Sequence, residues 1–364
     1  MTPVVLLAIG SSFFLSLTAT FVVRSWARRA GFLDRPGGHK GHDRPVALGG
    51  GVAIFVSIWV PLVVGTVLAW AMENRPPAWA PAMFATHVEG IASKLPLLLG
   101  LAAGALALHV VGFIDDRRPL GPWPKFVIEG VIALLVAGPM QVRLMEALPA
   151  PVSIALTVLW IVAITNAFNF LDNMDGLSAG VGVIASIVFA IAATNAGQVF
   201  VPIMAWVTAG ALLGFLVFNF APASIFMGDS GSLVIGYTLS VLTILTTYYD
   251  PEAGMLPLGV VVPFMVLAVP LYDVISVVVR RIRAGQNPFV GDRRHFSHRL
   301  VSRGMRPSRA VLTIYLATAA TALPAMVLPR LPWAEALLLL VQCVCVVIMI
   351  AILEHPSTSL SKSA

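Results

Sequence analysis

Charged residues are scarce in this chain. Asp, Glu, Lys and Arg together make up only 11% of its 364 residues, whereas 58% of the residues are hydrophobic. A soluble domain normally carries charge on about a quarter of its residues. The composition therefore excludes an ordinary soluble protein and indicates an integral membrane protein.

Cysteine is almost absent as well. The only two, Cys343 and Cys345, are two positions apart on one predicted helix, so their side chains point in different directions. This spacing excludes a disulfide between them and a metal site of normal geometry built on the pair. Because no internal repeat divides the sequence, we expect residues 1–364 to form a single membrane domain.

Long apolar runs are abundant. A run of about 20 such residues is long enough to cross roughly 30 Å of hydrocarbon as a helix. The predicted fold is all-α, a polytopic integral membrane bundle with about 11 transmembrane helices. The predicted spans are residues 4–23, 48–70, 95–114, 126–140, 152–168, 177–194, 199–220, 232–248, 256–279, 310–328 and 334–353.

The distribution of basic residues predicts the orientation of these spans. Of the 23 Lys and Arg residues, all but Arg75, Lys94, Arg143 and Arg330 lie in the tail or in loops after odd-numbered spans. The positive-inside rule therefore places the N-terminus outside and the C-terminus inside. The first span lacks a basic leader and a small-residue cleavage site, so we expect a retained helix. The net charge of +6 follows from the same bias and does not indicate a nucleic-acid partner.

The few acidic residues gather where predicted spans end on the cytoplasmic side. Asp115 and Asp116 follow the third span, Asp172 and Asp175 follow the fifth, and Asp229 follows the seventh. A carboxylate near hydrocarbon is costly unless it is paired, hydrated or bound to a cation. Oxygen ligands of this kind suit Mg²⁺, which shares its remaining positions between water and substrate phosphates. The pattern favours a divalent-metal site.

A simpler interpretation is that these aspartates only end helices and hydrate loops. Adjacent carboxylates such as Asp115 and Asp116 repel each other unless a cation or an arginine compensates them. Arg117 and Arg118 follow at once and are able to do so. Both interpretations stay open at this point.

Two short segments carry more specific signals. In residues 166–180, Asn166, Asn169 and Asn173 would share a helical face and offer a hydrogen-bonding strip to a base or sugar edge. In residues 226–232, Asp229 stands between two glycines just before a span, where free N–H groups at a helix start favour an anion. Alone, the second segment is equally typical of a helix cap. Together they indicate a cradle for a metal and a diphosphate.

Two basic loops complete the pattern. Residues 31–51 contain Lys40 and His42, which would either anchor to lipid headgroups or bind phosphate. Residues 280–309 hold nine basic residues, with His295 and His298 three positions apart. Because no thiolate accompanies the histidines, we favour an anion clamp with Arg293, Arg294 and Arg299 over a zinc site.

Three further polar residues lie inside predicted spans. We expect His109 and Glu129 to be satisfied by their neighbours, and Asp273 to have a structural or supporting role.

The chain resembles the polyprenyl-phosphate N-acetylhexosamine-1-phosphate transferases. The resemblance rests on four motifs in the same order and on one face of the membrane: the acidic pair, the Asn-rich segment, residues 226–232 and the 292–298 loop. The resemblance covers roughly residues 30–305. Members are polytopic helical enzymes that move a sugar 1-phosphate from a UDP-sugar to a lipid phosphate with Mg²⁺ and release UMP. The chain departs from the family pattern at Asn173, where many members have glycine, and at Ser297, where many have histidine.

The resemblance implies a role for each acidic motif. Asp229 would be the principal Mg²⁺ ligand, and Mn²⁺ would be a possible substitute. Asp172 and Asp175, together with Asn169, would shape the metal and nucleotide pocket. The remaining catalytic candidates, which would position the lipid phosphate, are Asp115 and Asp116.

The same resemblance assigns the polar and basic residues to substrate binding. His295, His298, Arg293 and Arg294 would hold the sugar diphosphate. Lys40 and His42 resemble the family's basic N-terminal loop, and Asn166 belongs to the nucleotide-binding segment.

We therefore expect an enzyme of the bacterial inner membrane whose site faces the cytoplasm. Its expected partners are a UDP-N-acetylhexosamine and a polyprenyl phosphate, and a homodimer is a further possibility. The branch that uses UDP-N-acetylglucosamine is favoured over the peptidoglycan branch that uses a UDP-muramoyl pentapeptide. From another class, an ion-coupled transporter would place carboxylates near the bilayer midplane between repeated halves. A scaffold or receptor would tolerate loss of Asp115 and Asp229.

Overall fold

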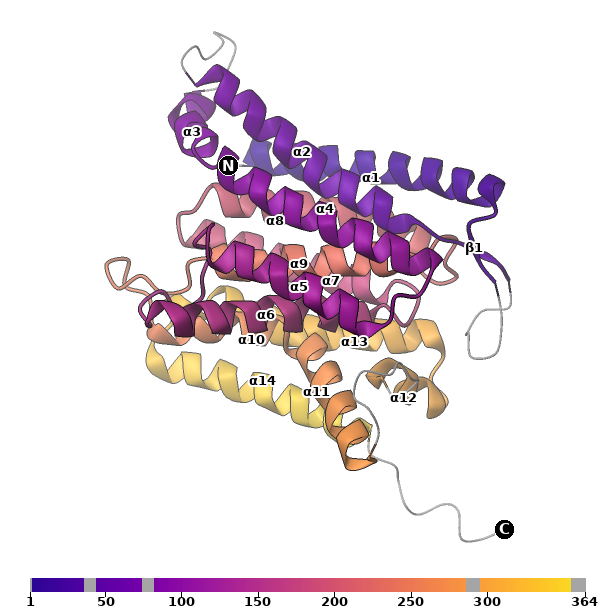
Figure 1. Cartoon of the computed structure of the whole chain (residues 1–364). Coiled ribbons are helices and arrows are strands. Elements are labelled where there is room, and N and C mark those ends of the chain that lie inside the picture. The colour runs from indigo at the N-terminus through magenta and orange to yellow at the C-terminus, as the bar shows by residue number, and fades with distance from the viewer. Residues whose placement is uncertain (1, 36–43, 74–81, 286–294, 355–364) are drawn as a thin grey trace.

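The computed structural model describes residues 2–35, 44–73, 82–285 and 295–354, and it confirms the predicted helical class (Figure 1). Within these residues the strands are β1 (Leu33–Asp34) and β2 (Val46–Ala47), which pair antiparallel. The longer helices run side by side across the view, and β1 and α12 lie at the same end of the bundle.

The order and bounds of the helices follow the predicted spans closely. They are α1 (Thr2–Ala30), α2 (Gly50–Met72), α3 (Ala82–Ala92), α4 (Leu95–Arg117), α5 (Pro122–Ala137), α6 (Ala150–Leu171), α7 (Leu177–Asn195), α8 (Phe200–Asn219), α9 (Asp229–Leu245), η1 (Pro257–Val261), α10 (Val262–Val266), α11 (Ala268–Arg283), α12 (Phe296–Ser302), α13 (Pro307–Ala322), η2 (Leu323–Met326), η3 (Leu328–Arg330) and α14 (Trp333–Leu353).

Eight of the described helical segments are long and apolar enough to cross a membrane, or nine if one bent pair counts as a span. Two other predicted spans correspond to shorter helices, α5 with 16 residues and α9 with 17. The bent pair falls in the predicted ninth span, where α11 leaves the preceding helical turns at 67°. Pro270 has no N–H to donate to Val266, four residues earlier, so the helix breaks easily there. The count of eleven spans stays a prediction.

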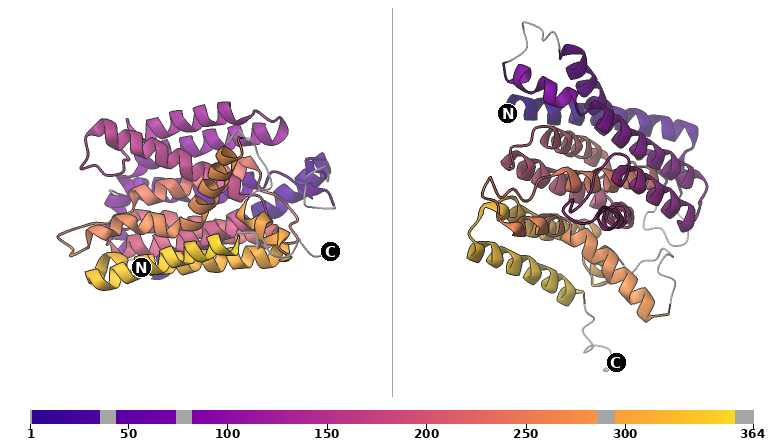
Figure 2. Two further views of the ribbon diagram at one scale, coloured as in Figure 1. Left: turned by 90° about the horizontal axis from the view of Figure 1, so that it is seen from below. Right: turned by 60° about the vertical axis from the view of Figure 1, so that its left-hand side comes forward.

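The core of the bundle lies around α7 and α9. In the most apolar stretch of 18 residues of each helix, 78% of the residues are buried in α7, compared with 22% in α1 and 17% in α14. Figure 2 shows the bundle from two other directions, and in its right-hand view the N-terminal and C-terminal helices lie at opposite sides. The helix α9, although short, is therefore enclosed by other helices.

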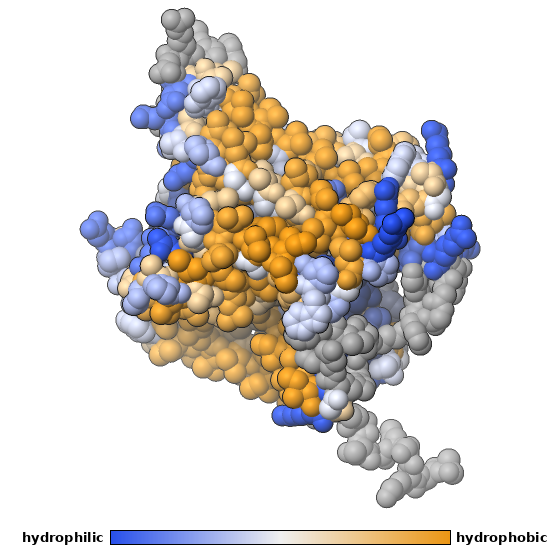
Figure 3. Space-filling view, in the orientation of Figure 1, coloured by the Kyte–Doolittle hydropathy of each residue, from blue (hydrophilic) through white to orange (hydrophobic). Residues whose placement is uncertain are grey.

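Exposed apolar side chains cover the middle of the molecule. Figure 3 shows hydrophobic side chains across the centre of the visible face, with hydrophilic ones gathered toward its left and right ends. This arrangement is typical of a protein that crosses a bilayer, where lipid solvates the apolar band and water meets the two ends. The protein is a multi-pass helical membrane protein.

Candidate functional site

The site is built around the first turn of α9. Gly228, with φ of 66°, precedes the helix, and Asp229 is its first residue. Asp116, at the end of α4, accepts hydrogen bonds from the backbone N–H of Asp229 at 2.7 Å and of Ser230 at 3.2 Å. These first N–H groups therefore bind an anionic group, as expected, but that group is the Asp116 carboxylate of the chain itself.

Glycine makes this close approach between α4 and α9 possible. A Cβ atom at Gly228 would lie 2.4 Å from Oδ2 of Asp116, and one at Gly112 would lie 2.5 Å from the carbonyl oxygen of Asp229. Real Cβ atoms do not approach other atoms this closely. Any side chain at Gly112 would thus push α4 and the start of α9 apart.

The segment before α2 holds the other side of this turn. Phe226 donates its N–H to the carbonyl oxygen of Ala47 at 2.8 Å, and Gly50 donates to the carbonyl oxygen of Phe226 at 3.0 Å. Gly51 donates to the carbonyl oxygen of Met227 at 3.0 Å. These two segments lie far apart in the sequence, yet backbone hydrogen bonds join them directly.

Lys125, on α5, is a site residue that the sequence analysis missed. Its ammonium group lies 2.6 Å from Oδ2 of Asp229 and 3.1 Å from Oδ2 of Asp115. The other oxygen of Asp115 accepts the backbone N–H of Leu120 at 2.7 Å. Lysine ten residues after an aspartate pair is a weak signal, since only the turn before α5 folds it back onto the carboxylates.

A cavity of about 310 Å³ opens beside this lysine. Its polar lining comes from the ends of α4, α5, α6 and α9, and its apolar lining comes mainly from aromatic and proline side chains. The lining residues are Asp115, Pro119, Gly121, Pro122, Lys125, Phe126, Glu129, Asn166, Asn169, Phe170, Asp229 and Leu233. The cavity therefore joins an ionic end to an apolar wall, which suits an amphiphilic ligand.

Glu129 departs in part from its expected role as a satisfied residue. Its Oε2 atom accepts a hydrogen bond from the Asn166 amide, but its buried Oε1 has no hydrogen-bond partner among the described residues. The expectation was right for His109, whose Nδ1 lies 3.0 Å from the carbonyl oxygen of Ser230. Glu129 thus lines the cavity with one carboxylate oxygen hydrogen-bonded and the other buried.

The predicted asparagine strip forms only in part, because Asn166 and Asn169 line the cavity whereas Asn173 is not among its lining residues. Asn166 contacts Glu129, whereas Asn169 donates to the hydroxyl of Ser232 at 3.2 Å. Asn173 lies beyond the end of α6, where its amide N–H donates to the carbonyl oxygen of Phe170 at 2.6 Å. The strip fails at Asn173 because the helix ends at Leu171, which turns Asn173 away from the other two.

The two aspartates of this segment have different surroundings. Asp175 accepts the backbone N–H of Ala223 at 2.8 Å and so holds the loop after α8. Asp172, just after α6, is half-buried. Burial and the negative charges of Asp229, Asp116 and Asp175 raise the pKa of the Asp172 carboxyl well above its usual value. We call Asp115, Asp116, Asp172 and Asp229 the carboxylate cluster.

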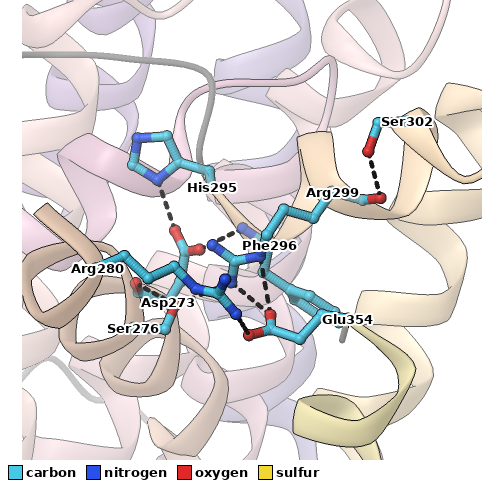
Figure 4. Close-up of polar contacts among 8 residues, drawn as sticks. All are labelled: Asp273, Ser276, Arg280, His295, Phe296, Arg299, Ser302 and Glu354. Atoms are coloured by element: carbon cyan, nitrogen blue, oxygen red, sulfur yellow. Dashed lines mark hydrogen bonds and ion pairs between the residues drawn. The ribbon is translucent and has the colours of Figure 1, made fainter. Parts of the chain in front are cut away.

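His295 lies beside this region rather than in the cavity lining. Its Nδ1 atom is 2.8 Å from Oδ2 of buried Asp273, and Oδ1 of the same aspartate accepts the Phe296 N–H at 2.6 Å (Figure 4). Asp273 thus contacts His295, a predicted site residue, which agrees with the supporting role expected for Asp273. The His295 ring packs on Phe170, which lines the cavity, with 5.8 Å between ring centroids.

The short helix α12 also contacts the end of α6. The Ser297 hydroxyl donates to Oδ1 of Asn173, so the two positions that depart from the family pattern touch each other. His298 is half-buried on the same helix. Four other predicted site residues, Lys40, His42, Arg293 and Arg294, lie outside the described residues.

The donor set decides whether a divalent cation fits this region. Among the described residues, no group of three or more His, Cys, Asp or Glu side chains is arranged to hold a metal ion. Burial and, after it, the charges of Asp229, Asp116 and Asp175 raise the pKa of Asp172, and the donors of this cluster are carboxylate oxygens. Such a donor set fits Mg²⁺ in chemical type. The assignment of Asp229, Asp172 and Asp175 as ligands stays a prediction.

Together, the fold and the site define a multi-pass helical membrane protein with an acidic cavity at the ends of its helices. The sequence model described as glycosyl transferase family 4 matches residues 98–247, which contain the whole carboxylate cluster. A Bacillus subtilis protein named probable undecaprenyl-phosphate N-acetylglucosaminyl 1-phosphate transferase is 34% identical over 311 residues, covering 82% of this chain and 78% of the relative. The chain therefore belongs to glycosyl transferase family 4, as the resemblance predicted.

Other relatives carry similar names. Decaprenyl-phosphate N-acetylglucosaminephosphotransferase of Mycobacterium tuberculosis is 33% identical over 329 residues, covering 82% of this chain and 76% of the relative. Undecaprenyl-phosphate alpha-N-acetylglucosaminyl 1-phosphate transferase of Escherichia coli is 25% identical over 322 residues, covering 85% of this chain and 80% of the relative.

Proposed function

We propose that this protein transfers N-acetylglucosamine 1-phosphate from UDP-N-acetylglucosamine to a polyprenyl phosphate and releases UMP. The observation that carries the proposal is the cavity in which Asp115, Lys125 and Asp229 meet beside an apolar wall. The names of three similar proteins support the choice of sugar and lipid.

The reaction joins two anions, so its barrier is dominated by charge. In a direct displacement, an oxygen of the lipid phosphate forms a bond to the sugar-bearing phosphorus. The bond from that phosphorus to the bridging oxygen breaks, and UMP leaves with the electron pair. Positioning and neutralisation of charge on the oxygens supply most of the catalysis in such reactions. The alternative route through a phosphosugar bound to the enzyme would use the same groups.

We assign the chain's own residues to binding and positioning. Asp229 and Asp172 would hold Mg²⁺, which supplies charge neutralisation at phosphate oxygens when bound. Lys125 adds a fixed positive charge between Asp115 and Asp229. Asp116 holds the first turn of α9, and through it the Asp229 backbone, in place. The apolar wall around Phe126 and Phe170 would receive the start of the isoprenoid chain.

We further propose a bacterial inner-membrane location with the cavity at the cytoplasmic face. The excess of basic residues in loops at that side supports this orientation, with the N-terminus outside and the C-terminus inside. Each of the eleven predicted spans overlaps a described helix or group of helical turns, and eight or nine of the described segments are long and apolar enough to cross a membrane. An odd number of spans is compatible with termini on opposite sides.

The test is a UMP-release assay with purified protein. UDP-N-acetylglucosamine, undecaprenyl phosphate and Mg²⁺ are mixed with wild-type protein and, as a matched control, with an Asp229→Asn variant. We expect UMP release that needs both substrates and stops on chelation. UDP-N-acetylmuramoyl pentapeptide in place of the first substrate tests the peptidoglycan branch. Absence of UMP release with every UDP-N-acetylhexosamine tried would refute the proposal, and uptake into sealed vesicles without nucleotide consumption would favour a transporter.

A further inference from the structure

A second charged group, which we call the Glu354 cluster, consists of Glu354, Arg280, Arg299 and Ser276. Glu354 directly follows α14, yet only 4% of it is exposed. Its Oε1 atom accepts a hydrogen bond from Nη2 of Arg280 at 2.6 Å, and its Oε2 atom accepts one from Nε of Arg299 at 2.9 Å. Figure 4 shows both guanidinium groups directed at this carboxylate. One side chain thus joins α14, α11 and α12.

The helix α12 is fixed to α11 at two points. At its start, Asp273 binds His295 and the N–H of Phe296. In its middle, Arg299 donates from Nη2 to the Ser276 hydroxyl at 2.8 Å. Asp273, Ser276 and Arg280 follow one another at spacings of three and four, so they share one face of α11. Glu354 closes this arrangement from the opposite side.

The need for such a closure follows from the length of α12. A helix of seven residues is not stable in isolation, so tertiary contacts must hold it. Without the Glu354 carboxylate, the guanidinium groups of Arg280 and Arg299 would face each other with no shared counter-charge. A partly buried cation that loses its partner is strongly destabilised, and Arg299 would move to regain solvent or another acceptor.

We propose that Glu354 is a positioning residue: through Arg299 it holds α12, and thereby His295, in place for an anionic substrate. A helix that only needed to end at Leu353 would not require a buried carboxylate shared between two arginines. His295 lies against Phe170, so a shift of α12 reaches the cavity wall directly. The kinetic consequence of this inference rests on the proposed function, whereas its structural consequence does not.

The test uses the full-length protein in detergent with the substitution Glu354→Gln, which keeps the shape of the side chain and removes its charge. Glu335→Gln, an equal change at an exposed position in the first turn of the same helix, is the matched control. Hydrogen exchange of the backbone amides of residues 296–302 reports on α12 without reference to catalysis. We expect exchange there to be about tenfold faster or more in Glu354→Gln and unchanged in Glu335→Gln.

Steady-state UMP release provides the second readout. In Glu354→Gln we expect KM for the UDP-sugar to rise about tenfold, with kcat changed less than about threefold, because ordering of the binding helix is lost while the carboxylate cluster stays intact. Glu354→Asp keeps the charge on a shorter stem and should recover part of both effects. Should Glu354→Gln not fold, Glu354→Asp is measured in its place, with a smaller change in the same direction.

Two results would overturn the inference. One is unchanged exchange of residues 296–302 in a folded Glu354→Gln protein. The other is faster exchange confined to α14 with unchanged KM, which would assign Glu354 only to the end of that helix. If the wild-type protein releases no UMP at all, the proposed function fails, and the exchange measurement still decides the positioning role.

Discussion

The carboxylate cluster and the Glu354 cluster balance charge in opposite ways. In the first, one ammonium group, that of Lys125, bridges two aspartates, and Asp172 lies near them with a raised pKa. In the second, one carboxylate is shared by two guanidinium groups. A buried charge is costly until it is compensated, so the sign left in excess indicates the ligand each region can accept. In our proposals, the first region accepts a cation, and the helix held by the second contributes to binding an anion.

The largest expected effect comes from neutralising the carboxylate cluster at its centre. Asp229→Asn removes the charge that contacts Lys125 and, in our proposal, Mg²⁺, and we expect kcat for UMP release to fall about 10³-fold. Glu252→Gln, at an exposed loop position, should leave kcat unchanged. Equal activity of the Asp229→Asn protein would mean that the excess negative charge has no catalytic use.

A purely steric change in the same region should have the next largest effect. Gly112→Ala places a Cβ atom 2.5 Å from the carbonyl of Asp229, so it displaces the start of α9 without altering any charge. Because misplacement by about 1 Å costs on the order of 10²-fold in rate, we expect a loss of that size. Gly130→Ala, where no atom lies within 4 Å of the added Cβ, is the control. Similar kinetics of the two variants would argue against a fixed geometry at this turn.

The raised pKa of Asp172 predicts a pH effect of intermediate size. The pKa of this carboxyl is higher in the folded protein than in the unfolded chain. Its contribution to stability is therefore fully present at pH values below the unfolded-state pKa, and it is lost as the pH rises through the folded-state pKa. We therefore expect the melting temperature of the metal-free protein to fall across this window as pH rises. Excess Mg²⁺ should offset the fall, since a metal ion binds the deprotonated carboxylate.

Differential scanning measurements over this pH range, with and without Mg²⁺, check the expectation. Asp172→Asn should flatten the dependence, whereas Asp250→Asn, in the loop after α9, should keep it. The Mg²⁺ concentration for half-maximal UMP release should fall with rising pH by at most about tenfold per unit. If the melting temperature of Asp172→Asn depends on pH as in the wild-type protein, Asp172 does not belong to the carboxylate cluster.

The smallest effect is expected at the edge of the Glu354 cluster. The Arg280 side chain is 36% exposed, against 12% for Arg299, so solvent already screens its interaction with Glu354. We expect Arg280→Gln to raise KM for the UDP-sugar about twofold to threefold, because Arg299 still holds the carboxylate. Arg283→Gln, an exposed arginine on the same helix, should change nothing. If Arg280→Gln raised KM more than Glu354→Gln does, Arg280 rather than Glu354 would be the main positioning residue of the cluster.

The motifs were visible in the sequence because each is local. Asp115 and Asp116, and Asp229 with its glycines, stand at the ends of helices that apolar runs of spanning length define, and the structure places them at such ends. His295 stands in a basic loop, and the structure places it just before the short helix α12. The asparagine strip was wrong at Asn173 for an equally local reason. Helix α6 ends at Leu171, but the prediction extended the helical spacing of the asparagines as far as Asn173.

Contacts between distant segments escaped the sequence. Lys125 was counted only for the orientation of the chain, because nothing local shows that its ammonium group reaches Asp229, 104 positions later. Glu354 carried no signal at all, since an acidic residue near the end of the last helix is ordinary and its partners are 55 and 74 positions away. The capping of α9 by Asp116 was also hidden, as it joins residues 113 positions apart.

The sequence by itself determined the membrane class, the positions of the helices and the chemical type of the site, because hydrocarbon thickness and backbone hydrogen bonding translate directly into runs of apolar residues. Only the tertiary structure decided which charges meet. Electrostatic interactions depend on the distance between atoms in space, and packing at glycines such as Gly112 and Gly228 sets that distance without leaving a pattern of charge along the chain.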